Sequence, residues 1–331
     1  MSEGASALAR GILAGDRRVL ARAITLVESR RPDDERQALA LLRELLPDHR
    51  RGLRLGVSGS PGVGKSSLLE KLGLLLIQRG SRPAVLAIDP TSQRGGGSVL
   101  GDKTRMVELS RHPSAYVRPS PSGAEGGGVA RTTGDVLMLC EAAGFSPCLV
   151  ETVGVGQAET AVTSVVDLLL VLLEPGAGDE LSGIKRGLNE WGDVLAVNKA
   201  DGVREDLART TAAEFGVALS VLRPFAEPPL VLPISTQTGL GIEPLWQAIE
   251  ARHEQLIHTG ELEERRFAQR RSELSRRLSS ALMQQFLADP ARAHRLAEIT
   301  PRVATGELLI ADAIAELLSN QPRAGSADAA R

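Results

Sequence analysis

The segment from residue 56 to 67 contains the residues whose types and spacing define a chemistry most clearly. It reads Gly-Val-Ser-Gly-Ser-Pro-Gly-Val-Gly-Lys-Ser-Ser and fits the phosphate-binding pattern G-x-x-x-x-G-K-[ST] at every position. Glycines let backbone N–H groups wrap a phosphate, and the start of a following helix adds partial positive charge. We expect Lys65 to reach the β- and γ-phosphates and Ser66 to ligate Mg²⁺. The predicted phosphate-binding residues are Gly59, Ser60, Pro61, Gly62, Val63, Gly64, Lys65, Ser66 and Ser67.

The residues around this loop predict the elements that would position it. Leu53, Leu55 and Val57 alternate with other residues before it, as in a short strand. Residues 67–78 carry apolar side chains at helical spacing after it. A strand, a glycine loop and a helix in this order are the context that the motif requires.

The residues Asn198, Lys199 and Asp201 belong to an N-K-x-D pattern that follows an apolar run. A carboxylate at Asp201 would accept hydrogen bonds from N1–H and the exocyclic amine of guanine, whereas adenine offers no N1–H there. We expect Asn198 to brace the loop and the Lys199 stem to lie over the base. Ser235 and Thr236 open a further loop that would meet guanine O6; the alternative is an ordinary turn.

Three carboxylates are candidates for the surroundings of Mg²⁺. Glu151 ends a buried run, Asp89 follows another, and Asp102 lies in the glycine-rich segment between them. For Asp89 and Asp102 the alternative is a surface loop with solvated charges. Gly154 could donate its N–H to the γ-phosphate, and Gln157 is a candidate for orienting water.

Residues 174–185 form another glycine-punctuated loop, which carries Asp179, Glu180 and Lys185. It is either a further switch that faces the nucleotide or a partner, or a plain connection.

Apolar strands alternate with helices between residues 53 and 250, which predicts a doubly wound α/β domain with a mostly parallel sheet. In such sheets ligands bind at the carboxyl ends of the strands. The candidate strands are 53–58, 84–88, 115–118, 147–151, 167–173, 193–197 and 231–234.

Helical extensions flank this domain. Asp16 caps a first amphipathic helix, and a second carries an apolar stripe that includes Leu39 and Leu46. These helices are either a regulatory cap or a structural one. Beyond residue 259 an Arg- and Glu-rich helix contains Leu274, Leu278, Leu282 and Phe286, and another helix is expected from about Thr305 to Leu318. The predicted parts are an N-terminal helical extension at 1–50, the phosphate-loop domain at 51–258, a C-terminal helical arm at 259–320 and a flexible tail at 321–331.

Composition limits the classes of partner. The net charge of −2 and an aromatic content of 2% argue against nucleic-acid binding. The two cysteines, Cys140 and Cys148, lack metal-ligand spacing. The longest apolar run, 168–173, is too short to span a bilayer, and the N-terminus lacks the pattern of a signal peptide. We therefore expect a cytoplasmic protein with no membrane partner.

Together these motifs make the chain resemble a MeaB/ArgK-type GTPase over roughly residues 1–320. The strings that carry the resemblance are the phosphate loop, Asp-Pro-Thr-Ser at 89, Gly-Gly-Ser-Val-Leu-Gly-Asp-Lys-Thr-Arg-Met at 96, Glu-Thr-Val-Gly-Val-Gly-Gln at 151, Glu-Pro-Gly-Ala-Gly-Asp-Glu-Leu-Ser-Gly-Ile-Lys at 174 and Asn-Lys-Ala-Asp at 198. The family implies a metallochaperone-like P-loop GTPase of the SIMIBI class. Its members associate with adenosylcobalamin-dependent acyl-CoA mutases, typically methylmalonyl-CoA mutase, protect them and gate cofactor loading.

The resemblance also implies roles for individual residues. Lys65 and Ser66 belong to the phosphate loop, and Asp89, Asp102 and Glu151 match the carboxylates around Mg²⁺. The loop at 174–185 matches the family's additional switch, in which we expect Lys185 to couple GTP hydrolysis to the mutase. Family members are homodimers joined largely by their C-terminal helices; packing of the arm onto the chain's own GTPase domain is the alternative.

Two other functions compete with this one. Nickel- or zinc-insertion GTPases of the same class usually carry Cys or His clusters, which this chain lacks. A kinase tied to amino-acid transport is an older description in this family, but no segment resembles a site for a phosphoacceptor substrate.

Overall fold

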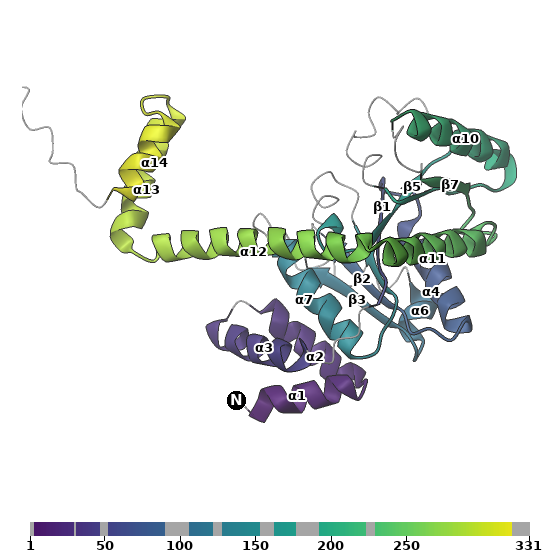
Figure 1. The fold of residues 1–331 in the computed structure, drawn as a ribbon, viewed down its shortest axis with the longest axis horizontal. Coiled ribbons are helices and arrows are strands. Elements are labelled where there is room, and N and C mark those ends of the chain that lie inside the picture. The colour runs from purple at the N-terminus through teal and green to yellow at the C-terminus, as the bar shows by residue number, and fades with distance from the viewer. Residues whose placement is uncertain are drawn as a thin grey trace, which may run out of the picture. The chain divides into compact units, whose positions relative to one another are not determined.

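The computed structural model describes residues 3–29, 31–46, 52–89, 106–121, 128–152, 162–176, 192–222 and 229–319 (Figure 1). The chain forms two compact units, residues 1–271 and 272–331, and the division falls inside helix α12, Glu261–Leu287.

A seven-stranded sheet lies at the centre of the first unit, in the order β3-β2-β4-β1-β5-β6-β7 (Figure 1). Every pairing between neighbouring strands is parallel, so the predicted doubly wound α/β fold is confirmed. All the predicted strands form, with ends displaced by a few residues. They are β1 (Arg54–Gly59), β2 (Ala84–Asp89), β3 (Tyr116–Pro121), β4 (Cys148–Glu151), β5 (Leu168–Leu173), β6 (Val194–Val197) and β7 (Leu230–Pro233).

Helices cover both faces of the sheet, and successive side chains of each strand point to opposite faces. The side chains of one strand are therefore buried alternately in two hydrophobic clusters. In β5, Leu169 and Val171 join one hydrophobic cluster, whereas Leu168 and Leu170 join the other. The first cluster includes residues of α7 (Gly128–Ala142) and α10 (Glu205–Leu222), which follows the short 3-10 turn η5 (Gly202–Arg204). The second includes residues of α4 (Lys65–Gln78), α6 (Val107–Arg111) and α11 (Ile242–Thr259).

Three N-terminal helices add a further layer over α7: α1 (Glu3–Leu13), α2 (Arg17–Glu28) and α3 (Pro32–Leu45). The predicted cap at Asp16 is confirmed, since its carboxylate accepts the backbone N–H groups of Arg18 and Val19. Glu28 pairs with Arg118 of β3 at 2.5 Å, which ties α2 to the sheet.

The apolar stripe predicted for the helix that corresponds to α3 was partly wrong. Ala38, Leu41 and Leu45 are buried, but Leu39 and Leu46 are exposed. The residues that pack recur at intervals of three and four, so that Leu39 falls on the solvent side of α3.

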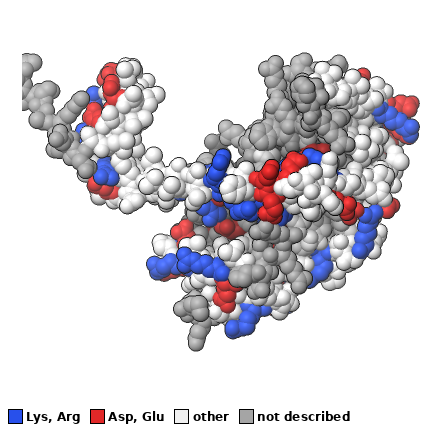
Figure 2. Space-filling model, in the orientation of Figure 1, with Lys and Arg blue, Asp and Glu red and all other residues white. Residues whose placement is uncertain are grey.

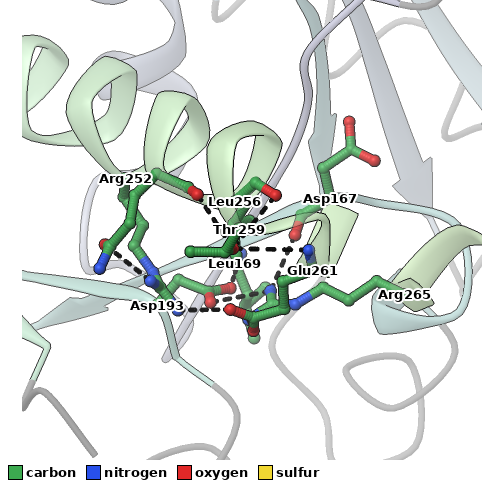
Figure 3. A network of polar contacts seen from close by, with 9 residues as sticks. Asp167, Leu169, Asp193, Arg252, Leu256, Thr259, Glu261 and Arg265 are labelled. Atoms are coloured by element: carbon green, nitrogen blue, oxygen red, sulfur yellow. Dashed lines mark hydrogen bonds and ion pairs between the residues drawn. The ribbon is translucent and has the colours of Figure 1, made fainter. Parts of the chain in front are cut away.

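A network of hydrogen bonds and ion pairs joins α12 to the amino ends of β5 and β6 (Figure 3). Asp193 accepts the N–H of Leu169 at 2.9 Å, and Arg265 of α12 donates both to Asp193 and to the carbonyl of Asp167 at 2.9 Å. Glu261 receives a hydrogen bond from Arg265 at 2.9 Å. The first turns of α12 are therefore part of the first unit.

The second unit contains the rest of α12 with α13 (Pro290–Ala304) and α14 (Ile310–Leu318). From Asp289-Pro290 the sequence predicts an interruption after the Arg- and Glu-rich helix, and the structure has α12 end at Leu287, Asp289 cap α13 and Pro290 begin it. The helix expected from Thr305 was placed too early, because α13 ends at Ala304, Gly306 adopts φ +78° and α14 begins at Ile310.

Both cysteines are buried core residues. Burial, reinforced by the charge of Glu141, raises the pKa of Cys140 to about 12, and burial also raises the pKa of Cys148 well above its usual value. Both thiols therefore stay protonated at neutral pH.

On the face shown in Figure 2, acidic and basic side chains of the described surface are interspersed. Among the described helices, none combines the length and apolar character needed to cross a membrane.

Candidate functional site

The predicted site residues that the structure describes lie at the carboxyl edge of the sheet. Since the strands are parallel, the segments that leave them emerge at the same edge. β1 lies centrally, between β4 and β5, and β6 and β7 follow on one side. The residues at or just after these strand ends that bear on the site are Gly59, Glu151, Glu174, Asn198 and Ser235.

The phosphate loop connects β1 to α4 through backbone conformations that require glycine. Gly64, which begins α4 as its N-cap, has φ +102°, and a Cβ there would lie 2.3 Å from Nδ2 of Asn198. No side chain caps this helix start. Its first N–H groups have no partner within the helix and point toward the loop, an arrangement that suits an anion. Lys65 is buried, and its Nζ donates to the carbonyl oxygens of Gly59 at 2.7 Å and Ser60 at 3.0 Å. A lysine charge is thus held inside the loop.

Ser66 and Glu151 meet beneath the phosphate loop. Ser66 Oγ donates to Glu151 Oε1 at 2.7 Å, although 85 residues separate them in sequence. The end of β4 is fixed there because the N–H and the hydroxyl of Thr152 both donate to the carbonyl of Val57, at 3.0 and 3.3 Å. A hydroxyl and a carboxylate are hard oxygen ligands of the kind that Mg²⁺ takes, so these two residues fit that ion.

The base-reading motif is braced against the phosphate loop. Asn198, which follows β6 and is buried, donates through Nδ2 to the carbonyl of Val63 at 2.7 Å and accepts the N–H of Thr236 at 3.2 Å. Ser235 Oγ donates to Asp201 Oδ2 at 2.5 Å. The hydroxyl of Ser235 itself accepts the N–H groups of two later loop residues, Gln237 and Thr238. The Asp201 carboxylate therefore has a defined orientation at the edge of the sheet.

Lys199 contacts a residue to which the sequence motifs gave no role of its own. Its Nζ lies 2.7 Å from Oε1 of Glu174, the residue that follows β5. The available signal was a carboxylate directly after a buried apolar run, the same signal that singled out Glu151 after β4.

Several predicted residues lie outside the described residues: Asp102, Gly154, Gln157 and Lys185. Asp89 is the last residue of β2, which β4 separates from β1, and its side chain is also outside the description. Of the loop 174–185, the structure describes residues 174–176.

Comparison of the chain with known proteins shows the family to which it belongs. The family model for the methylmalonyl-CoA mutase-associated GTPase MeaB matches residues 20–291. A probable GTPase from Mycobacterium bovis is 45% identical over 314 residues, covering 94% of this chain and 93% of that protein. The mitochondrial methylmalonic aciduria type A homolog of Mus musculus is 40% identical over 310 residues, covering 90% of this chain and 75% of that protein. A crystal structure described as a LAO/AO transport system kinase has a TM-score of 0.76 at 32% identity and covers 96% of this chain and 97% of that one.

Proposed function

This chain belongs to the MeaB family of GTPases and hydrolyses GTP, and from that premise we propose that it is a chaperone of an adenosylcobalamin-dependent acyl-CoA mutase. Methylmalonyl-CoA mutase is the proposed client, since the family description names that enzyme and the mouse relative is named for methylmalonic aciduria. The chain would use GTP hydrolysis to gate cofactor loading and to protect or reactivate the mutase. We propose a cytoplasmic location.

The choice of client rests on these descriptions, and the hydrogen bond between Ser66 and Glu151 is the observation that carries the proposed nucleotide-dependent switch. It joins the phosphate loop to the start of segment 151–157, so a change at the γ-phosphate would reach that segment directly. Ser66 and Glu151, with Asp89 and Asp102, are the proposed Mg²⁺ ligands, directly or through water. When bound, Mg²⁺ would neutralise charge on the phosphates.

Guanine selection is assigned to Asp201, with Ser235 orienting its carboxylate and Asn198 holding the loop against Val63. Asp201→Asn should weaken GDP binding and shift the preference toward xanthine nucleotides, because an amide can donate where a carboxylate only accepts. Isothermal titration of GDP, XDP and ADP tests this. Equal affinity of the wild type for GDP and ADP would refute the assignment.

Hydrolysis should depend on Lys65. Its ammonium, which donates to carbonyl oxygens of the phosphate loop, would stabilise negative charge that develops on the phosphates, so Lys65→Ala should lower turnover by roughly two orders of magnitude. Turnover is measured at saturating GTP and Mg²⁺, with Lys71→Ala on the same helix as the control. Wild-type turnover in Lys65→Ala would contradict this role.

Coupling to the mutase is assigned to the segments 89–105, 151–157 and 174–185. A chaperone must bind its client differently in its two nucleotide states, since a ligand shifts an equilibrium only through differential affinity. We propose that Lys185 carries this coupling. In Lys185→Ala, GTP affinity should stay close to that of the wild type, while the mutase should no longer accelerate hydrolysis.

The decisive assay measures GTP turnover with and without methylmalonyl-CoA mutase, for wild type and Lys185→Ala. An equal response of both proteins would remove Lys185 from the coupling. A wild type that responds to no acyl-CoA mutase would contradict the choice of client. Transfer of phosphate to an added periplasmic binding protein would instead favour the kinase named in the description of the related crystal structure.

Homodimer formation through the C-terminal helices is also proposed. The support is a stripe of exposed apolar side chains on α12, at Leu274, Leu278 and Leu282. An apolar stripe of this kind requires a partner surface.

A further inference from the structure

We propose that Glu174 is a positioning residue for nucleotide binding: its carboxylate holds Lys199 so that the lysine stem forms one wall of the base site. This inference rests on the proposed guanine site at residues 198–201. It concerns a residue that touches the nucleotide only through another side chain.

The backbone at Lys199 fixes the direction in which its side chain leaves the loop. Lys199 has φ +64°, the one positive value among the described residues other than glycine. Such a conformation persists in a residue with a side chain only where the surroundings enforce it. Here hydrogen bonds hold both neighbours, from Asn198 N–H to the Leu173 carbonyl and from Ala200 N–H to the Ile234 carbonyl, each at 2.9 Å.

Glu174 is held just as closely on the adjacent strand end. Leu173, the residue before it, accepts the N–H of Asn198, the residue before Lys199. Two residues further on, the N–H of Gly176 donates to Oγ1 of the buried Thr211 in α10 at 3.0 Å. Glu174 and Lys199 thus lie at the ends of two adjacent strands, β5 and β6, which backbone hydrogen bonds hold together. Their ion pair joins these two strand ends.

The ion pair therefore selects one conformation of a long, flexible side chain. A lysine side chain has four rotatable carbon–carbon bonds, and an untethered ammonium would sample many of their rotamers. With Nζ tied to Glu174, the methylene stem is ordered before a nucleotide arrives. A wall that is already ordered costs less entropy when the base binds against it.

The alternative is that Glu174 and Lys199 form a surface ion pair without consequence for the ligand. Their side chains are 41% and 33% exposed, which is the setting of many such pairs. A close match elsewhere in the chain is the pair of Glu250 with Arg79, at 46% and 31% exposed and 3.2 Å apart. Glu250→Gln is therefore a matched control for removing one carboxylate charge from the surface.

A double-mutant cycle on the full chain tests the proposal, with ribose-labelled fluorescent GDP as the probe. Glu174→Gln should raise the Kd by about two- to fivefold, the range of a partly exposed ion pair. Lys199→Met keeps an apolar stem and removes the charge. In that background Glu174→Gln should change nothing, because the carboxylate no longer has an ammonium to hold.

Two further readouts separate positioning from a general structural effect. GDP and IDP should weaken by the same factor in Glu174→Gln, because a stem that lies on the ring face does not read the exocyclic amine. The kcat at saturating GTP should stay at the wild-type value while KM rises. The control Glu250→Gln should leave Kd, KM and kcat at wild-type values.

Three results would overturn the proposal. The first is an unchanged Kd in Glu174→Gln. The second is an equal rise in Kd when Glu174→Gln is made in the wild type and in the Lys199→Met variant. The third is a fall in kcat. The guanine site itself is tested separately by Asp201→Asn and by the preference of the wild type for GDP over ADP. A wild type that passes those tests while Glu174→Gln binds normally would contradict only the role of Glu174.

Discussion

Arg266 and Asp167, 99 residues apart in the sequence, form a two-point contact at the amino edge of the sheet. Nε of Arg266 donates to Oδ1 of Asp167 at 2.8 Å and Nη2 donates to Oδ2 at 2.7 Å, with side chains 7% and 1% exposed. Asp167 also accepts the N–H of Arg54 at the start of β1, and Arg266 donates to the carbonyl of Gly52. The contact joins the first turns of α12 to the amino ends of β1 and β5.

Removing Arg266 should destabilise the protein strongly. Arg266→Ala would leave the buried Asp167 carboxylate without its cation, which costs about 3–5 kcal/mol in free energy of unfolding. Urea denaturation followed by circular dichroism measures the change. The control is Arg270→Ala on the same helix, where the side chain is 56% exposed and lies 3.9 Å from Glu263; its effect should stay within about 0.5 kcal/mol. A loss below about 1 kcal/mol in Arg266→Ala would show that the buried pair is dispensable.

The same contact determines where the C-terminal arm can be removed. A chain that ends at Arg271 keeps Leu262 and Arg266, which are both buried, and should fold and bind GDP. A chain that ends at Gly260 loses both and should aggregate or unfold on heating at a much lower temperature than the longer one. Thermal melts compare the two chains, and light scattering on the longer one tests the proposed dimer. A dimer of residues 1–271 would place the interface outside residues 272–331.

The fold was largely predictable because its signals are local. Continuous apolar runs such as 168–173 mark strands covered on both faces, and each is followed by the loop that carries its polar residues. The contacts between distant segments were not predictable in this way. Nothing in the sequence near Asp167 indicates that its partner is Arg266 rather than another of the arginines of α12. No helix was predicted between Pro290 and Ala304, because Asp289-Pro290 was interpreted as an interruption, although proline is well accommodated in the first turn of a helix.

In the candidate site, too, local features were predictable from the sequence and contacts between distant segments were not. The residue types of the phosphate loop and of the Asn-Lys-Ala-Asp motif follow from spacing alone. Their mutual placement depends on the order of strands in the sheet, which sets β6 two strands from β1. The hydrogen bond from Asn198 to Val63 and the ion pair from Lys199 to Glu174 both follow from that order.

Gly64→Ala should abolish nucleotide binding. A Cβ at this position would come within 2.3 Å of Asn198 Nδ2, so the phosphate loop and the base-reading loop would have to separate. The control is Gly62→Ala in the same loop: Gly62 also has positive φ, at +82°, but no described atom lies within 4 Å of the position that its Cβ would take. Gly62→Ala should incur only the backbone strain, on the order of 1–2 kcal/mol. Fluorescent GDP titration compares the two variants, and equal affinities would show that the contact with Asn198 is not limiting.

The stability of the first unit should fall in mild acid because of His253 on α11. This side chain is half-buried, and within the described residues its buried Nε2 has no hydrogen-bond partner. Burial lowers its pKa and the positive charge of Arg266 lowers it further, while Asp167 and Glu254 act in the opposite direction. The folded protein therefore disfavours the protonated imidazole.

The sign of the effect follows from linkage. Above the unfolded pKa of about 6.5 the imidazole is neutral in both states and contributes nothing. Below it the unfolded chain binds the proton first, so the free energy of unfolding falls as the pH drops toward the lower folded pKa. The melting temperature of the wild type should therefore fall more between about pH 7.5 and about pH 5.5 than that of His253→Asn. His258→Asn, at an exposed position of the same helix, should keep the wild-type dependence. An equal fall in His253→Asn and wild type would show that other groups determine the acid sensitivity.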